Sequence, residues 1–144
     1  MSLVLGYDES PAAVRALHVA IELAAALHEP LVLVYGAAAP GALGEEYRTH
    51  LEALHEAGRK VLDHAAGVAE GAGVPTTMEV LDEKPAQALL DAALRHGARF
   101  IVVGSWGEGP VRGALLGSTP HKLLHLSPVP VICVPMDEGG SEGE

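Results

Sequence analysis

The chain has 144 residues, of which 49% are hydrophobic and only 3% aromatic, so Ala, Val and Leu must build its core. This length suits a single domain, and such small side chains suit helices packed closely on a sheet. The formal net charge of −10 argues against a nucleic-acid partner, because the few Lys and Arg residues form no basic stripe.

Two further features bear on the compartment. The single cysteine, Cys133, cannot form an internal disulfide, and its apolar neighbours predict a buried small residue. No apolar run is long enough for a membrane span, and the chain shows no signal-peptide pattern. We therefore expect a cytoplasmic protein with no membrane partner. Residues 1–136 are expected to form one domain, and the acidic, glycine-rich residues 137–144 a disordered tail.

The beginning of the chain predicts a strand followed by a helix. Residues 3–6 are an apolar strand, after which Ser10 and Pro11 are typical of a helix N-cap and a first helical residue. We expect the buried stripe of this helix, at helical spacing, to comprise Val14, Leu17, Ile21, Ala24 and Leu27 or His28.

The remaining elements keep the same alternation. They are predicted, in chain order, as a strand over 31–35, a flexible loop over 36–44, a helix over 45–70, a strand over 76–81, a helix over 85–96 capped by Gly97, a strand over 100–103, a helix over 118–126 and a strand over 129–134. The strands are apolar without an inward–outward rhythm, which is typical of a parallel sheet covered on both faces. We therefore predict an α/β fold with a single doubly wound five-stranded sheet, which binds ligands beyond the carboxyl ends of its strands.

One stretch carries the strongest functional signal. A strand runs into Gly104, a second glycine follows at Gly107, and Gly117 and Ser118 open the next helix, in the spacing Gly-x2-Gly-x9-Gly-Ser. Such a loop offers unpaired amide hydrogens and the positive end of a helix dipole, with no Cβ to keep an anion away. The motif therefore predicts a phosphate-binding loop.

This motif, together with the opening Leu3–Ser10 and the closing Leu126–Pro135, resembles the universal stress proteins over nearly the whole chain. The resemblance implies a five-stranded parallel sheet in the order 3-2-1-4-5, with ATP or a related adenine nucleotide bound where strands one and four meet. It also implies a stress-response role and a homodimer formed through the edge of strand 129–134.

The same resemblance implies roles for particular residues. Asp8 would lie by the nucleoside with the Gly6 backbone beside it, and Asp8 is also a possible Mg²⁺ contact. The Gly36 backbone would face the adenine, and Val103 would line the base and ribose pocket. The phosphates would be surrounded by Gly104, Gly107, Gly117, Ser118 and Thr119.

Some residues depart from the family pattern. Trp106 stands where the family often has a basic or imidazole side chain, Glu108 places a carboxylate in the loop, and Pro120 removes one amide hydrogen from the helix start. Arg112 is the only evident cation of the loop. AMP, ADP or another nucleotide is therefore an alternative to ATP.

Several of these residues have a second interpretation. The three glycines could turn a surface loop only, Asp8 could stabilise the first helix only, and Ser118 is a natural N-cap with or without phosphate. Asp82 follows the third strand as a receiver-domain phosphoacceptor would, but no lysine follows the fifth strand. The pairs His121/His125 and His50/His55 lack a third metal ligand, which favours surface or packing roles.

The expected function is a regulatory nucleotide-binding module with little or no catalysis. The chain has neither a Gly-x-Ser-x-Gly elbow nor a Gly-x4-Gly-Lys-Ser/Thr loop. Two alternatives remain open: a nucleotide-free dimeric interaction protein of the same fold, and a slow hydrolase that uses Asp8-bound Mg²⁺.

Overall fold

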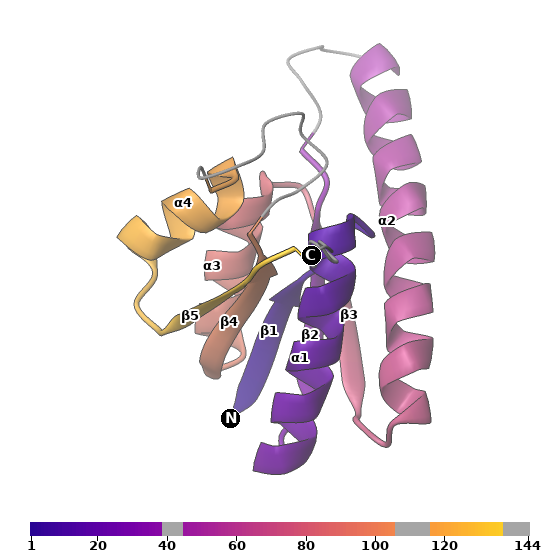
Figure 1. Ribbon diagram of the computed structural model, residues 1–144. Coiled ribbons are helices and arrows are strands. Elements are labelled where there is room, and N and C mark those ends of the chain that lie inside the picture. The colour runs from indigo at the N-terminus through magenta and orange to yellow at the C-terminus, as the bar shows by residue number, and fades with distance from the viewer. Residues whose placement is uncertain (39–44, 106–115, 137–144) are drawn as a thin grey trace, which may run out of the picture.

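A computed structural model describes residues 1–38, 45–105 and 116–136. Its centre is a five-stranded sheet in the order β3-β2-β1-β4-β5, with every neighbouring pair parallel (Figure 1). The elements are β1 (Ser2–Gly6), α1 (Pro11–Leu27), β2 (Leu31–Gly36), α2 (Glu45–Gly71), β3 (Thr76–Leu81), α3 (Pro85–Arg95), β4 (Ala98–Gly104), α4 (Ser118–Leu126) and β5 (Val131–Val134). The predicted fold class and strand order are confirmed.

Part of the predictions falls outside the described residues. These are the tail at 137–144, most of the loop at 36–44, and the loop residues Trp106, Gly107, Glu108 and Arg112. Among the helices that the structure does describe, none is both long enough and apolar enough to cross a membrane.

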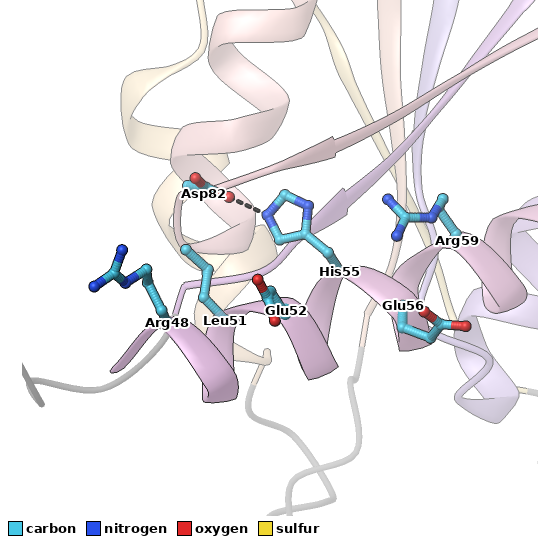
Figure 2. A pocket seen from close by; sticks show the side chains of 7 residues that line it. All are labelled: Arg48, Leu51, Glu52, His55, Glu56, Arg59 and Asp82. Carbon is cyan, nitrogen blue, oxygen red and sulfur yellow. Dashed lines mark hydrogen bonds and ion pairs between the residues drawn. The ribbon is translucent and has the colours of Figure 1, made fainter. Parts of the chain in front are cut away.

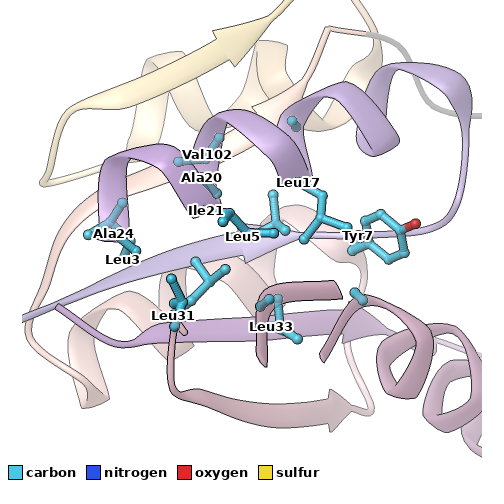
Figure 3. Packing of buried hydrophobic residues seen from close by; sticks show 14 of the residues in the cluster. Leu3, Leu5, Tyr7, Leu17, Ala20, Ile21, Ala24, Leu31, Leu33 and Val102 are labelled. Atoms are coloured by element: carbon cyan, nitrogen blue, oxygen red, sulfur yellow. The ribbon is translucent and has the colours of Figure 1, made fainter. Parts of the chain in front are cut away.

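The sheet separates two apolar layers. One face packs against α1 and α2 through residues such as Leu5, Leu33 and Val102, and Figure 3 shows part of this cluster beneath α1. The other face packs against α3 and α4 through residues such as Val4 and Ile101. Successive strand residues point to opposite faces, and both faces are buried at the central strands β1 and β2, which are therefore apolar along nearly their whole length. The edge strand β3 is more exposed and carries Thr76, Thr77 and Glu79.

The first helix is capped as the sequence predicts, but its buried face is shifted. The Ala13 amide donates to the Ser10 hydroxyl at 3.3 Å, and Pro11 begins the helix. Leu17, Ile21 and Ala24 are buried, whereas Val14 and Leu27 are 38% and 37% exposed. The prediction was wrong at Val14 and also at its last position, because His28, the alternative to Leu27, is exposed as well. Small residues carry the contact instead: Ala12, Ala13, Ala16 and Ala20 are buried.

The ends of the later elements differ slightly from the prediction. Strand β5 begins at Val131, because the Ser127 hydroxyl accepts from the Val129 amide at 3.1 Å and donates to the Val129 carbonyl at 2.7 Å, holding a turn there. Gly97 adopts the left-handed conformation, φ 57°, that ends α3. Cys133 is only half-buried, and its burial raises the pKa of the thiol.

Candidate functional site

The carboxyl ends of three adjacent strands bring the predicted site residues to one edge of the sheet. Gly6, Gly36 and Gly104 end β1, β2 and β4, and Leu5 lies in register with Val102. The winding reverses between β1 and β4, because the chain proceeds outward from β1 to β2 and β3 and then returns to β4 and β5. Ligands of doubly wound sheets bind at such a reversal.

The glycine at the end of β4 is required by packing. A Cβ on Gly104 would lie 2.7 Å from both the backbone carbon and the Cβ of Ala12. The first turn of α1 therefore rests directly on the end of β4. This contact sets the N-terminus of α1 beside the strand end that enters the predicted phosphate loop.

The two other strand-end glycines are also in tight places. A Cβ on Gly36 would lie 2.7 Å from the Glu83 carbonyl oxygen and from Pro85 Cα, so the β3–α3 connection crosses this backbone closely. A Cβ on Gly6 would lie 2.9 Å from Cδ1 of Leu89. Packing alone thus requires Gly36, whereas Gly6 meets the end of a flexible side chain.

Asp8 is engaged at the start of α1. Its Oδ1 accepts from the Ser10 amide at 3.0 Å and from the Ser10 hydroxyl at 2.7 Å. The same hydroxyl accepts from Ala13, so Asp8 and Ser10 together cap the helix. Asp8 therefore has a structural role at the start of α1, and its contact with a nucleoside or Mg²⁺ stays a prediction.

The turn after β1 is strained and acidic. Glu9 has a φ of 64°, the left-handed region that side chains other than glycine rarely adopt. Tyr7 precedes it with only 4% of its surface exposed. Burial raises the pKa of Tyr7, and the carboxylates of Glu9 and Asp8 raise it further. An anion bound at this edge would need the dipoles of nearby helix N-termini to offset these carboxylates.

Ser105 connects the end of β4 to β5 and to the start of α4 by hydrogen bonds, and the predictions from sequence did not include it among the site residues. Its amide donates to the Val134 carbonyl of β5 at 2.8 Å, and its carbonyl accepts from the Gly117 amide at 2.8 Å. Its hydroxyl is buried without a hydrogen-bond partner among the described residues. The two ends of the motif therefore meet at Ser105. The available signal was its position directly after Gly104.

The start of α4 differs from the prediction in one respect. Gly117, not Ser118, is the N-cap, with extended backbone and no side-chain cap, and the His121 amide donates to the Gly117 carbonyl at 3.1 Å. Ser118 is exposed as the first helical residue. Pro120 has no amide hydrogen, so Ser118 and Thr119 supply the free donors expected in the first turn.

The remaining site prediction concerns the pocket wall. Val103 is 3% exposed and packs in the layer that α3 and α4 cover, 3.4 Å from the place where a Gly6 Cβ would stand. The structure thus brings together Gly6, Val103 and Gly104, and it joins Gly117 to the end of β4 through Ser105. Gly107 lies outside the described residues.

A groove lies at the β3 end of the same edge of the sheet. It is open, has a volume of about 540 Å³ and lies between the first half of α2 and Asp82, which follows β3. Figure 2 shows the side chains that line it. His55 points across it and pairs with Asp82. Its lining mixes both charges: Arg48, Leu51, Glu52, His55, Glu56, Arg59 and Asp82. Because Asp82 is engaged by a histidine and faces no lysine in this groove, the geometry gives no support to a receiver-type phosphoacceptor.

Comparison with known proteins assigns a family. The model of the universal stress protein family matches residues 1–135. A universal stress protein of Thermus aquaticus is 34% identical over 139 residues, which cover 92% of this chain and 97% of the relative. Another, from Mycolicibacterium smegmatis, is 33% identical, and there the match spans 94% of this chain but only 48% of the relative.

Solved structures agree with this assignment. A protein of the universal stress protein family from Burkholderia pseudomallei is 32% identical with a TM-score of 0.74, over 93% of this chain and 96% of that one. A universal stress protein in complex with cAMP is 26% identical with a TM-score of 0.73, over 94% and 97% of the two chains.

Two more distant structures share the fold and were also solved with nucleotides. The Archaeoglobus fulgidus protein with dAMP is 23% identical, with a TM-score of 0.69 over 93% of this chain and 97% of that one. An Arabidopsis thaliana protein with AMP is 18% identical, with a TM-score of 0.70 over 99% and 97%. With its family model matched from the first residue to Pro135 and its strand order shared, the chain belongs to the universal stress protein family.

Proposed function

We propose that this chain binds an adenine nucleotide between the ends of β1 and β4 and acts as a stress-response regulatory module with little or no catalysis. The observation that carries the proposal is the Gly117–Ser105 hydrogen bond of 2.8 Å, because it holds the N-terminus of α4 against the end of β4. Helix N-termini at a winding reversal bind phosphate groups well. Related structures in complex with cAMP, dAMP and AMP support the adenine nucleotide as ligand.

The described residues fit such a ligand. The amides and hydroxyls of Ser118 and Thr119 would hold phosphate oxygens, and the buried hydroxyl of Ser105 lacks a partner among the described residues. ATP, with or without Mg²⁺ at Asp8, remains the nucleotide proposed. A bound nucleotide would supply the negative charge that these donors and the α4 dipole neutralise.

Regulation is proposed in place of catalysis for a chemical reason. Rapid phosphoryl transfer needs a residue that orients or activates the nucleophile. The Oδ1 of Asp8 already accepts two hydrogen bonds from Ser10, which ties this carboxylate to helix capping. Nucleotide occupancy would therefore act by ordering the surroundings of the site and changing a surface that partners recognise. A cytoplasmic location is part of the same proposal.

Thermal unfolding with MgATP, ADP and AMP tests the proposal. Ligand that binds only the folded state adds about 2.7 kcal/mol to the free energy of unfolding at 100 times its Kd, so the Tm should rise. Gly117→Val should abolish this rise, because a branched side chain would stand where phosphate approaches the helix start. A larger rise with ATP than with AMP would show that the phosphate chain contributes to binding.

The matched control is Gly67→Val on α2, where a Cβ has no neighbour within 4 Å. This variant should keep the full nucleotide response. Absence of any Tm rise with the wild-type chain would contradict nucleotide binding and favour the nucleotide-free interaction protein. Equal responses in wild type and Gly117→Val would place the ligand elsewhere.

A further inference from the structure

His121 and His125 form a pair on the exposed surface of α4. They are separated by one helical turn, and their ring centroids lie 4.9 Å apart with the ring planes at 69°. Both side chains are exposed. Residues four apart on a helix have Cβ atoms about 5–6 Å apart, so the two imidazoles can turn toward a common point.

The surroundings of this pair differ from those of the other paired histidines. His55 is paired with Asp82, and His96 lies 2.6 Å from a carboxylate oxygen of Glu79. Within residues 1–38, 45–105 and 116–136, the ring contact of His121 is with His125, and neither ring forms an ion pair with a carboxylate. Their ring nitrogens are thus available for a ligand that approaches from solvent.

The chemistry of two neighbouring imidazoles selects a class of ligand. Imidazole nitrogen suits Zn²⁺, Ni²⁺ and Cu²⁺, whereas Mg²⁺ and Ca²⁺ prefer oxygen ligands. Two histidines four apart on one helix face are the zinc-binding arrangement of the His-Glu-x-x-His motif. The edge-to-face contact does not obstruct such binding, because exposed side chains change rotamer within picoseconds to nanoseconds.

The sequence favours a surface or packing role for His121 and His125 because a third ligand is lacking, but we propose that the pair, with water as further ligand, forms a surface site for a divalent transition metal of the Zn²⁺, Ni²⁺ and Cu²⁺ class. The two imidazoles supply two ligands, and water completes the coordination. Among the described residues no group of three or more His, Cys, Asp or Glu residues could hold a metal ion, so the two imidazoles are the only ligands that this part of the chain supplies here. The bound metal would link two successive turns of α4, the helix whose N-cap is Gly117.

Calorimetric titration of the untagged chain with Ni²⁺ tests this site. Wild type should bind one equivalent, and His121→Gln or His125→Gln should each weaken binding by roughly tenfold or more, since even outer-shell changes at metal sites cost about 10–100-fold. The control variant, His18→Gln, removes another exposed histidine, on α1, and should leave the affinity unchanged. Mg²⁺ should produce no binding heat.

A second measurement locates the ion directly and does not depend on the folding of a variant. Substoichiometric Cu²⁺, which is paramagnetic, should broaden the imidazole NMR signals of His121 and His125 before those of the other six histidines among the eight. The proposal is overturned if broadening starts at other histidines. It is also overturned if Ni²⁺ does not bind, or binds His125→Gln as tightly as wild type.

Discussion

At the scale of single residues, the glycines at the strand ends have two explanations, close packing and ligand binding. A Cβ on Gly104 or Gly36 would lie 2.7 Å from backbone atoms of another element, so packing requires both glycines whether or not a ligand binds. Asp8 likewise has a structural task, because its Oδ1 binds both the amide and the hydroxyl of Ser10. A functional role for these residues therefore has to be measured by ligand binding, since loss of stability alone would not reveal it.

Gly36→Ala should lower the free energy of unfolding by about 1–3 kcal/mol, because the new methyl group would meet the backbone of Glu83 and Pro85, and overpacking costs this much. Gly67→Ala is the opposite case: its Cβ would stand in open space within α2, where alanine gains up to about 1 kcal/mol over glycine. Urea denaturation of both variants measures the difference. A Gly36→Ala protein as stable as wild type would show that the β3–α3 connection moves aside easily.

At the scale of elements, β5 is a short edge strand held to β4. The carbonyls of Pro130 and Val134 accept from Ile101 and Ser105 at 3.0 and 2.8 Å, so these alternate residues face β4. Val131 and Cys133 must direct their amides and carbonyls away from β4, to the side where no further strand of the described sheet lies. An edge with unpaired amides is a template for another strand, and we propose it as the homodimer contact through residues 129–134.

Cys133→Pro tests this contact, because proline removes one outward amide and none of the bonds to β4, as edge strands permit. We expect sedimentation velocity to show a dimer for wild type and for the control Cys133→Ala, and a shift toward monomer for Cys133→Pro. Far-UV circular dichroism should confirm that all three chains are folded. A dimer that survives the proline substitution would place the interface on another surface.

At the scale of the whole molecule, one charged cluster ties an edge strand to a helix. Glu79 on β3 lies 2.6 Å from both Arg95 and His96 at the end of α3, and its side chain is only 16% exposed. The hydrogen bond from Arg95 is the main reason why the pKa of Glu79 falls from 4.5 to about 2, and the bond from His96 adds to it. The ionised form is therefore favoured by folding.

Because the pKa of Glu79 is lower in the folded chain, its contribution to stability is complete above pH 4.5 and is lost as the pH falls toward 2. We expect this contribution to be about 1–2 kcal/mol after allowance for the solvent around Arg95. Glu79→Gln should lower the stability at pH 7 and flatten its decline in that window, as measured by urea denaturation at each pH. Glu70→Gln, an exposed change on α2, should keep the wild-type profile; an unchanged profile in Glu79→Gln would contradict the assignment.

The sequence by itself determined the alternation of strands and helices, since continuous apolar runs, the Ser10–Pro11 start and Gly97 act through local backbone preferences. It also determined that the glycine motif follows a buried strand, and the family resemblance added the strand order that the structure confirms. Helix starts and stops are local properties, which is why they could be predicted within a few residues.

Only the tertiary structure decided which of these residues are fixed by packing and which atoms remain available. The buried face of α1 includes Ala12, Ala13, Ala16 and Ala20, because close contact with the sheet selects small side chains. A hydrophobicity pattern gives alanine too little weight to predict this. The bonds of Ser105 to Val134 and Gly117 join segments far apart in the chain. Such contacts depend on how the strands and α4 are arranged in space, and the spacing of residues along a sequence does not contain that information.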